Sequence, residues 1–423
     1  MATSSSVGVL RKVLNNGLRV IIEPLSDFSS ISVGLWILTG SRDEDPNLVG
    51  ISHLIEHLAF KGTPSRSAKQ IALEIDSLGG VLNAFTSKEF TSFYAKVLGD
   101  SLPHALSILS DTTMNSLFRG EDINKEREII LQEISMVEDA PEDFVHDLHT
   151  REFWSGHSLG RPILGTSDSL KAITRKSILS YHQERYCPGS MIITAAGALD
   201  PDKLFAELER SYGGLAQGSS PEIRKAPEPT PRIRVVNRDL EQVHFCTGFE
   251  SIAVGDERRY ALFLMNTILG AGMSSRLFQK IREEHGLAYS VYSYPSAYQD
   301  TGMLTIYCGT SIDGFPTALD LVRQESKKLR ENPVSAVELD VAKRQLKGNL
   351  LLGLESTSNR MSQLARNEIY YGRHIAPEQI VEGIDEVTAG DISDLAATII
   401  NPDRMALTVI GPVNEDELNA GLA

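Results

Sequence analysis

The sequence predicts an α+β fold made of two homologous domains, each a mainly antiparallel sheet packed with helices. Three observations support this prediction. The predicted elements of both halves follow one order, two strands, two helices, two strands and then helices, which indicates gene duplication. Few strands are separated by the crossover helix that a parallel pair requires, and hairpins recur. A chain of 423 residues is also too long for a single hydrophobic core.

The first half begins with an Asn16-Gly17 turn signal before its first strand. Its last predicted helix opens at Asp122, whose side chain can act as an N-cap, and carries isoleucines at helical spacing. Its strands are predicted at 18–22, 31–38, 81–85 and 90–98, and its helices at 46–60, 68–78, 101–116 and 122–137.

The second half repeats this order after a proline-rich linker at 216–233. The prolines of this linker favour an extended spacer over a helix. Strands are predicted at 232–236, 243–249, 287–294 and 302–309, and helices at 256–269, 275–283, 312–331 and 334–355. The predicted domains are therefore 1–215 and 234–423.

Composition excludes several classes of protein. The net charge of 41 − 56 = −15 argues against a nucleic-acid partner, although such acidity can simply solvate the surface. The apolar stretches are far too short for a membrane span. Three cysteines (Cys187, Cys246 and Cys308) form no disulfide framework, and residues 1–6 contain no apolar signal core. A reducing, cytoplasmic location is expected.

The most informative stretch is His53-Leu54-Ile55-Glu56-His57, an H-x-x-E-H box within an apolar helical run. Residues four apart lie on one helix face, so His53 and His57 can bind one metal ion. Two imidazoles and a carboxylate suit Zn²⁺, and a neighbouring carboxylate such as Glu56 can act as general base. The alternative is an ordinary amphipathic helix that happens to carry histidines.

A zinc site of this kind needs a third protein ligand, and the helix predicted from Asp122 offers two glutamates. Glu126 and Glu133 are seven residues apart, so they share one face of that helix. Taken alone, Glu133 could equally belong to a solvated helix face.

The box, the distant glutamate and the intervening Glu-Arg-x-x-Ile-x-x-Glu-Ile pattern resemble the pitrilysin (M16) metallopeptidases over essentially the whole chain. The two-domain branch related to the mitochondrial processing peptidase is the better match. The resemblance implies His53, His57 and Glu133 as ligands of one Zn²⁺ per chain, with Glu56 as the base. It also implies that Glu126 supports the site without binding the metal itself. The corresponding helix of the second half ends Met265-Asn-Thr-Ile-Leu-Gly270 without a histidine pair, so its domain is expected to bind substrate.

Two further segments resemble substrate-binding parts of the family. The strand carrying Asn83, Ala84 and Phe85 resembles an edge strand to which a peptide adds, although a plain hairpin has the same pattern. Arg282 and Tyr289 resemble an arginine–tyrosine motif that reaches the scissile carbonyl, where a cation and a phenol would stabilise negative oxygen. The alternative is a surface arginine and a packed tyrosine.

A loop from His157 to Thr166 resembles a chamber-lining loop of the family, although its glycines and proline could explain it as a purely structural loop.

The resemblance implies a zinc-dependent endopeptidase. It would cleave unfolded or presequence-like peptides, held as an added β-strand inside a chamber formed by two chains. A homodimer is expected, because one chain carries both the zinc motif and the arginine–tyrosine motif. The alternatives are a β-like processing-peptidase subunit that needs a partner, and an inactive structural relative. Inactive relatives usually lose zinc ligands, whereas His53, Glu56, His57 and Glu133 are all present here.

Overall fold

The computed structural model describes residues 8–219 and 223–414. Contacts divide the chain into two compact units, and each is assembled from three stretches of sequence. Unit 1 contains Met1–Ile134, Arg161–Arg224 and Gly353–His374, and unit 2 contains Ser135–Gly160, Lys225–Leu352 and Ile375–Ala423. Residues 1–6, in which no apolar signal core was found, lie outside the described residues. Residues 220–222 of the predicted linker lie outside them as well.

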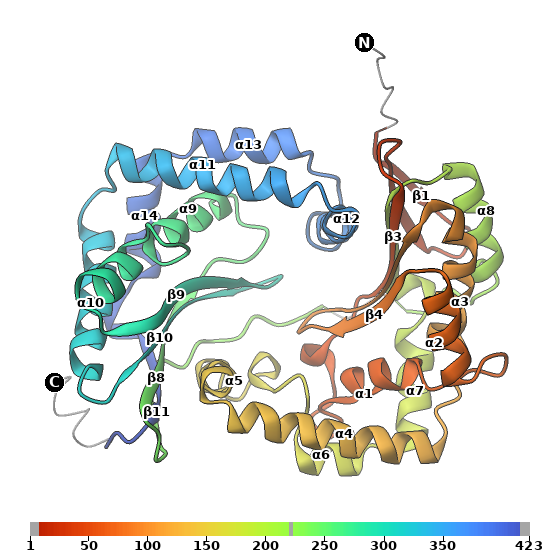
Figure 1. Ribbon diagram of the computed structural model, residues 1–423, viewed down its shortest axis with the longest axis horizontal. Helices are drawn as coiled ribbons and strands as arrows, with labels where there is room; N and C mark the ends of the chain where they lie inside the picture. Colours follow the sequence, from red (N-terminus) through yellow and green to blue (C-terminus); the bar gives the residue numbers. More distant parts are fainter. Residues whose placement is uncertain (1–7, 220–222, 415–423) are drawn as a thin grey trace. The chain divides into compact units, whose positions relative to one another are not determined.

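Unit 1 is built on a six-stranded sheet (Figure 1). One parallel pair, β2 with β6, interrupts its otherwise antiparallel ladder. In spatial order the strands are β1 (Leu10–Val13), β2 (Arg19–Pro24), β6 (Met191–Gly197), β3 (Ser30–Ile37), β5 (Thr91–Leu98) and β4 (Val81–Thr86).

Alternation along β3 explains how this sheet is covered. Ile31, Val33 and Leu35 point to one face because successive side chains of a strand alternate, and they join the main core of the unit. That core is completed by α1 (Ile51–Ala59), α3 (Leu102–Met114), α4 (Gly120–Asp139), α7 (Arg175–Arg185) and α8 (Pro201–Tyr212).

Unit 2 repeats this plan with a five-stranded sheet, again with one parallel pair, β7 with β11. Its strands in spatial order are β7 (Ile233–Asn237), β11 (Ala406–Gly411), β8 (Gln242–Ser251), β10 (Gly302–Ser311) and β9 (Ala288–Ala297). Its main core includes side chains from α9 (Arg259–Leu269), α10 (Phe315–Glu331) and α14 (Ala389–Ile399).

The opposite face of each sheet is covered by a helix from the other half of the sequence. Helix α12 (Thr357–Tyr371) packs on β2, β3 and β6, where Met361 and Leu364 meet Trp36. Helix α5 (Pro141–Phe153) packs on β8 and β11 (Figure 1), where Val145 and Leu148 join Cys246. The two halves of the sequence therefore each contribute one helix to the unit built mainly from the other half. The predicted limits 1–215, 216–233 and 234–423 stay a prediction about the two halves of the sequence.

The fold class and two-domain plan are confirmed, with corrections of detail. Strands β1, β6 and β11 were not predicted, although β6 and β11 lie in the interior of their sheets. Helix α1, which carries the H-x-x-E-H box, begins at Ile51 rather than at the predicted residue 46, because Gly50 adopts a left-handed φ of 94°. Asp122 is not an N-cap, because α4 already begins at Gly120. The remaining helices are α2 (Ala68–Ser77), α6 (Ser167–Ala172), α11 (Ala336–Gly353) and α13 (Pro377–Glu386), with a π-helix at Phe278–Glu284.

Within the described part of the chain, no helix combines the length and apolarity needed to cross a bilayer.

Candidate metal centre

Helix α1 places the two histidines of the motif side by side. Ile51, Leu54 and Ile55 are fully buried in the core of unit 1, which fixes the rotation of the helix about its axis. His53 and His57 then share the face one turn apart, and their ring centroids are 4.6 Å from each other.

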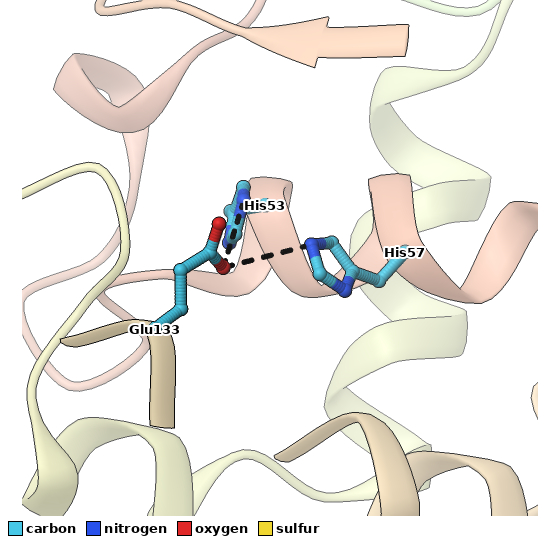
Figure 2. Close-up of side chains that lie close together, drawn as sticks. All are labelled: His53, His57 and Glu133. Atoms are coloured by element: carbon cyan, nitrogen blue, oxygen red, sulfur yellow. Dashed lines mark ion pairs between the residues drawn. The ribbon is translucent and has the colours of Figure 1, made fainter. Parts of the chain in front are cut away.

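Helix α4 brings Glu133 to the same point. Its Oε2 lies 3.9 Å from Nε2 of His53 and 3.9 Å from Nε2 of His57 (Figure 2). One ligand atom from each of the three side chains lies within 4.8 Å of the others. Among the described residues, this is the one group of three or more histidine, cysteine or acidic side chains close enough to hold a metal ion.

The chemistry of these atoms fits a zinc ion. Glu133 Oε2 is shielded from solvent and accepts no hydrogen bond. Burial, aided by the neighbouring charge of His57, lowers the pKa of His53 to about 4, so its imidazole is neutral at pH 7 and can act as a ligand. Three lone-pair atoms thus face one point, an arrangement that suits a cation. Two imidazoles and a carboxylate form a familiar three-ligand set for catalytic zinc.

Glu126 contacts His57 at the ring nitrogen that faces away from the other two candidate ligands. Its buried carboxylate places Oε2 3.2 Å from Nδ1 of His57 and Oε1 2.8 Å from Nζ of Lys61. A carboxylate on Nδ1 favours the tautomer that leaves Nε2 free for a metal. His53 has no such partner, because its buried Nδ1 makes no hydrogen bond. Glu126 therefore holds one of the two imidazoles and contributes no ligand atom.

Glu56 lies on the same helix and is held by the neighbouring strand. Thr86, at the end of β4, donates its hydroxyl proton to Oε2 of Glu56 at 2.6 Å. Burial raises the pKa of Glu56, and the Thr86 hydrogen bond opposes part of that rise. A carboxylate with a raised pKa is better matched to proton transfer near neutral pH. Thr86 was not among the predicted site residues.

The start of α1 is fixed by a buried carboxylate that sequence reasoning missed. Glu44 accepts the backbone N–H of Gly50 at 2.7 Å and of Ser52 at 2.9 Å, which satisfies two N–H groups at the open end of the helix. Burial raises the pKa of Glu44 to about 7. Its only sequence signal was an acidic residue a few positions before a helix, which is too common to single it out.

Two glycines allow the loop after His157 to contact this helix end. Gly50 and Gly165 both have left-handed φ values, 94° and 80°. A Cβ on Gly50 would lie 2.9 Å from the Cα of Gly165, and one on Gly165 would lie 2.6 Å from the carbonyl oxygen of Val49. The loop that resembled a chamber lining thus has a clear structural role at the N-terminus of α1.

The predicted substrate strand is β4, which lies at the edge of the sheet and is paired on one side by β5. Ala84 packs against the core, whereas Asn83 points outward and its Oδ1 accepts the N–H of Ala84. Phe85 is 39% exposed and packs edge-on against Trp36 and neighbouring aromatic rings.

Arg282 and Tyr289 lie together in unit 2. The Arg282 guanidinium donates to the Tyr289 carbonyl oxygen at 3.1 Å and stacks 4.7 Å from the centre of its ring. Between them Gly286, with a left-handed φ of 62°, separates the π-helix from β9. Tyr289 is 81% exposed, so it does not belong to the packed core. Their action on the same peptide bond as the metal centre stays a prediction.

Two family models match consecutive parts of this chain. Residues 19–167 match the Insulinase (Peptidase family M16) domain, and residues 172–346 match the Peptidase M16 inactive domain. The zinc protease YmxG of Bacillus subtilis is 40% identical, over 96% of this chain and 98% of that protein. A zinc protease of Streptomyces coelicolor is 39% identical, over 97% of this chain and 91% of its own length.

Two solved structures share the fold. A peptidase M16 inactive domain from Pseudomonas fluorescens has a TM-score of 0.91 at 21% identity, and the match covers 96% of this chain and 98% of that chain. A protease from Helicobacter pylori has a TM-score of 0.89 at 22% identity, with 96% and 100% covered. At such identities the likeness concerns the fold alone.

Proposed function

Because this chain belongs to peptidase family M16, we propose that it is a zinc-dependent endopeptidase with one zinc ion per chain, bound by His53, His57 and Glu133. The observation that carries the proposal is the convergence of these three side chains, with Glu56 beside them. The names of its relatives support a zinc metallopeptidase. Its substrates are unfolded or presequence-like peptides.

The side chains divide the work of hydrolysis. Zinc, when bound, supplies Lewis acidity that lowers the pKa of water and polarises the scissile carbonyl. Glu56 accepts the proton of the attacking water and later delivers it to the leaving amine. Thr86 orients the Glu56 carboxylate through its 2.6 Å hydrogen bond, and Glu126 orients His57. Both orienting groups come from elements packed in the same core, which keeps the geometry constant between turnovers.

The substrate binds as an extra strand on β4. Because β4 lies at the sheet edge, its unpaired backbone groups can hydrogen-bond a peptide whatever its side chains are. Asn83, Ala84 and Phe85 lie along this strand, and its last residue, Thr86, contacts Glu56. A peptide added here therefore runs toward the catalytic base. Arg282 and Tyr289 hold the carbonyl side of the substrate and stabilise its developing negative charge.

The working form is a homodimer that encloses a chamber, located in a reducing compartment such as the cytoplasm. All three cysteines are free and buried, which fits such a compartment. A single chain type suffices if the purified protein cleaves peptides alone.

The test is cleavage of a quenched fluorescent peptide by the purified chain, before and after removal of zinc by a chelator. We expect cleavage by the chain alone, its loss with the chelator and its return when zinc is added back. A chain that binds zinc but cleaves only with a second, different subunit would indicate a β-like processing subunit. A chain that neither binds zinc nor cleaves would be an inactive relative, and the proposal would be wrong.

A further inference from the structure

Two short segments beside the metal centre are joined along their backbones, and we call residues 41–44 and 87–89 together the clasp. Ser41 N–H donates to Ser87 O at 3.1 Å, and Arg42 N–H donates to Lys88 O at 2.8 Å. The Arg42 guanidinium pairs with the Glu89 carboxylate at 2.7 Å, and both side chains are almost fully buried. The clasp is therefore held by both backbone and buried charge.

The clasp fixes both parts of the centre that do chemistry. Its residue Glu44 binds the N–H groups that open α1, the helix of both histidines. Its residue Ser87 directly follows Thr86, whose hydroxyl holds Glu56. A shift of residues 87–89 against 41–44 would thus move the base relative to the helix that carries the ligands.

Arg224 binds both segments of the clasp at once. Its guanidinium makes two parallel 2.8 Å hydrogen bonds to the Asp43 carboxylate. The same group donates to the Glu89 carbonyl oxygen at 2.7 Å and lies 3.6 Å from the Glu89 carboxylate. Arg224 belongs to the predicted linker and is the last residue of unit 1 before the chain passes into unit 2. Its side chain is only 12% exposed.

Two other side chains, each near a point where the chain passes between the units, also contact the clasp. Arg161, the first residue after the chain returns to unit 1, donates to the Glu44 carbonyl oxygen at 2.9 Å. Tyr370, near the end of α12, donates its hydroxyl proton to Glu89 at 3.0 Å. The stretches 161–224 and 353–374 thus each send side chains to the same few residues, all of them within unit 1.

We propose that Arg224 is a positioning residue for the zinc site: by binding Asp43 and Glu89 together it sets the register of the clasp, and through it the placement of Glu56. This inference rests on the proposed peptidase function. The linker arginine acts through the clasp and touches neither metal nor substrate. Its planar fork matches the Asp43 carboxylate, so a lysine with the same charge cannot reproduce the contact.

The test compares Arg224→Ala with Arg232→Ala in the full chain. Arg232 is a matched control, because it lies in the same linker but binds Glu152 and Ser155 of unit 2. We expect kcat of Arg224→Ala on a quenched peptide to fall about tenfold or more, because misplaced catalytic groups lower the rate of the chemical step. KM and zinc content should stay unchanged. Arg232→Ala should stay within about twofold of the natural chain. Arg224→Lys should resemble the alanine variant.

Hydrogen exchange gives a readout that does not depend on activity. Arg224→Ala should exchange faster in segments 40–54 and 82–90, and Arg232→Ala should not. If Arg224→Ala does not fold, Tyr370→Phe removes one hydrogen bond to the clasp while it keeps the ring, and it should lower kcat severalfold. Its control is Arg360→Ala, which breaks the α12 ion pair to Glu23 away from the clasp.

The outcomes separate this inference from the proposed function. A natural chain without peptidase activity would overturn the function, and the exchange data alone would then judge the clasp. Unchanged kcat together with unchanged exchange in Arg224→Ala would overturn the role of Arg224. Equal losses in Arg224→Ala and Arg232→Ala would overturn it as well, because linker damage of any kind would then suffice.

Discussion

Helix α1 with strand β4 in unit 1 corresponds in element order to helix α9 with strand β9 in unit 2. Helix α1 comes after β3 and helix α9 comes after β8, and in each unit the strand forms the edge of the sheet. A side-chain hydrogen bond joins helix to strand in both. In unit 1 Thr86 donates to Glu56 at 2.6 Å, and in unit 2 Ser293 donates to the side-chain oxygen of Asn266 at 2.7 Å. The connection is the same, but an amide cannot accept a proton as a carboxylate does.

The two helices also differ in whether they carry residues that can bind a metal ion. Where α1 carries two histidines on one face, α9 buries Met265, Ile268 and Leu269 in its core. The comparison teaches that this fold needs the helix, the edge strand and the bond between them for packing, whereas the chemistry depends on a few side chains placed on that frame. Each of the following experiments removes or probes one such difference.

The largest effect is expected from His57→Ala, which makes the metal helix of unit 1 resemble its counterpart. Two ligands remain, too few for a stable catalytic zinc, so the variant should lose most bound zinc and its hydrolysis. Metal analysis of purified protein measures this. His104→Ala, at an exposed histidine that pairs with Glu74, should keep its zinc. Full zinc stoichiometry in His57→Ala would contradict the ligand assignment.

Glu126→Gln should weaken zinc binding without abolishing it. The variant keeps the volume but loses the charge that faces His57 Nδ1, and changes of this kind commonly cost about 10–100-fold in metal affinity. Competition with a chelator of known affinity measures the change. Glu128→Gln, at an exposed position of the same helix, is the control. Equal affinities in the two variants would leave Glu126 as part of the packing alone.

Tyr289→Phe asks whether unit 2 contributes to catalysis at all. Loss of its hydroxyl should lower kcat by about tenfold or more, the scale of one hydrogen bond to a charged group, while zinc content stays unchanged. Steady-state kinetics on several peptides provides the measurement. Unaltered kinetics on all of them would reduce unit 2 to a scaffold.

His149 in unit 2 is a buried histidine like His53, but its partner is the Thr408 hydroxyl rather than a possible metal. Burial lowers its pKa to about 3 from an ordinary value of 6.5, so the folded chain keeps it neutral. The unfolded chain takes up the proton first, and stability should therefore fall by about 1.4 kcal/mol per pH unit from about pH 6.5 down toward pH 3.

His149→Gln should remove that part of the acid sensitivity. Urea unfolding at pH 5 and pH 7, with chelator present to exclude metal, gives the two free energies of unfolding for each protein. The drop between the two pH values should be smaller in the variant by about 1–2 kcal/mol. An identical decrease in the free energy of unfolding in both proteins would show that His149 does not cause this acid sensitivity.

The helix of the H-x-x-E-H box and the repeated order of elements could be predicted from the sequence because both rest on local spacing. The roles of Glu126 and Glu133 were predicted from the family resemblance, because spacing alone shows only that they share a helix face. The partners of α5 and α12 could not. An apolar stripe shows that a helix is buried, but not which of two similar sheets it covers. Strands β6 and β11 did leave a local signal, the apolar runs 191–196 and 406–410, which helical neighbours on both sides obscured. Glu44 was missed because an acidic residue a few positions before a helix is a common pattern. Thr86 was missed because its partner Glu56 lies 30 residues away in the sequence.

The central claim is that the difference between the two units lies in Glu56 and the zinc beside it, and Glu56→Gln tests this most directly. The amide keeps the size of the side chain and can still accept the Thr86 hydrogen bond, but it cannot take a proton from water. Zinc content and peptide hydrolysis are measured on the same preparation. Zinc should remain at one per chain while the rate falls by about 10²–10⁴-fold. A variant that holds zinc and cleaves as fast as the natural chain would contradict the account.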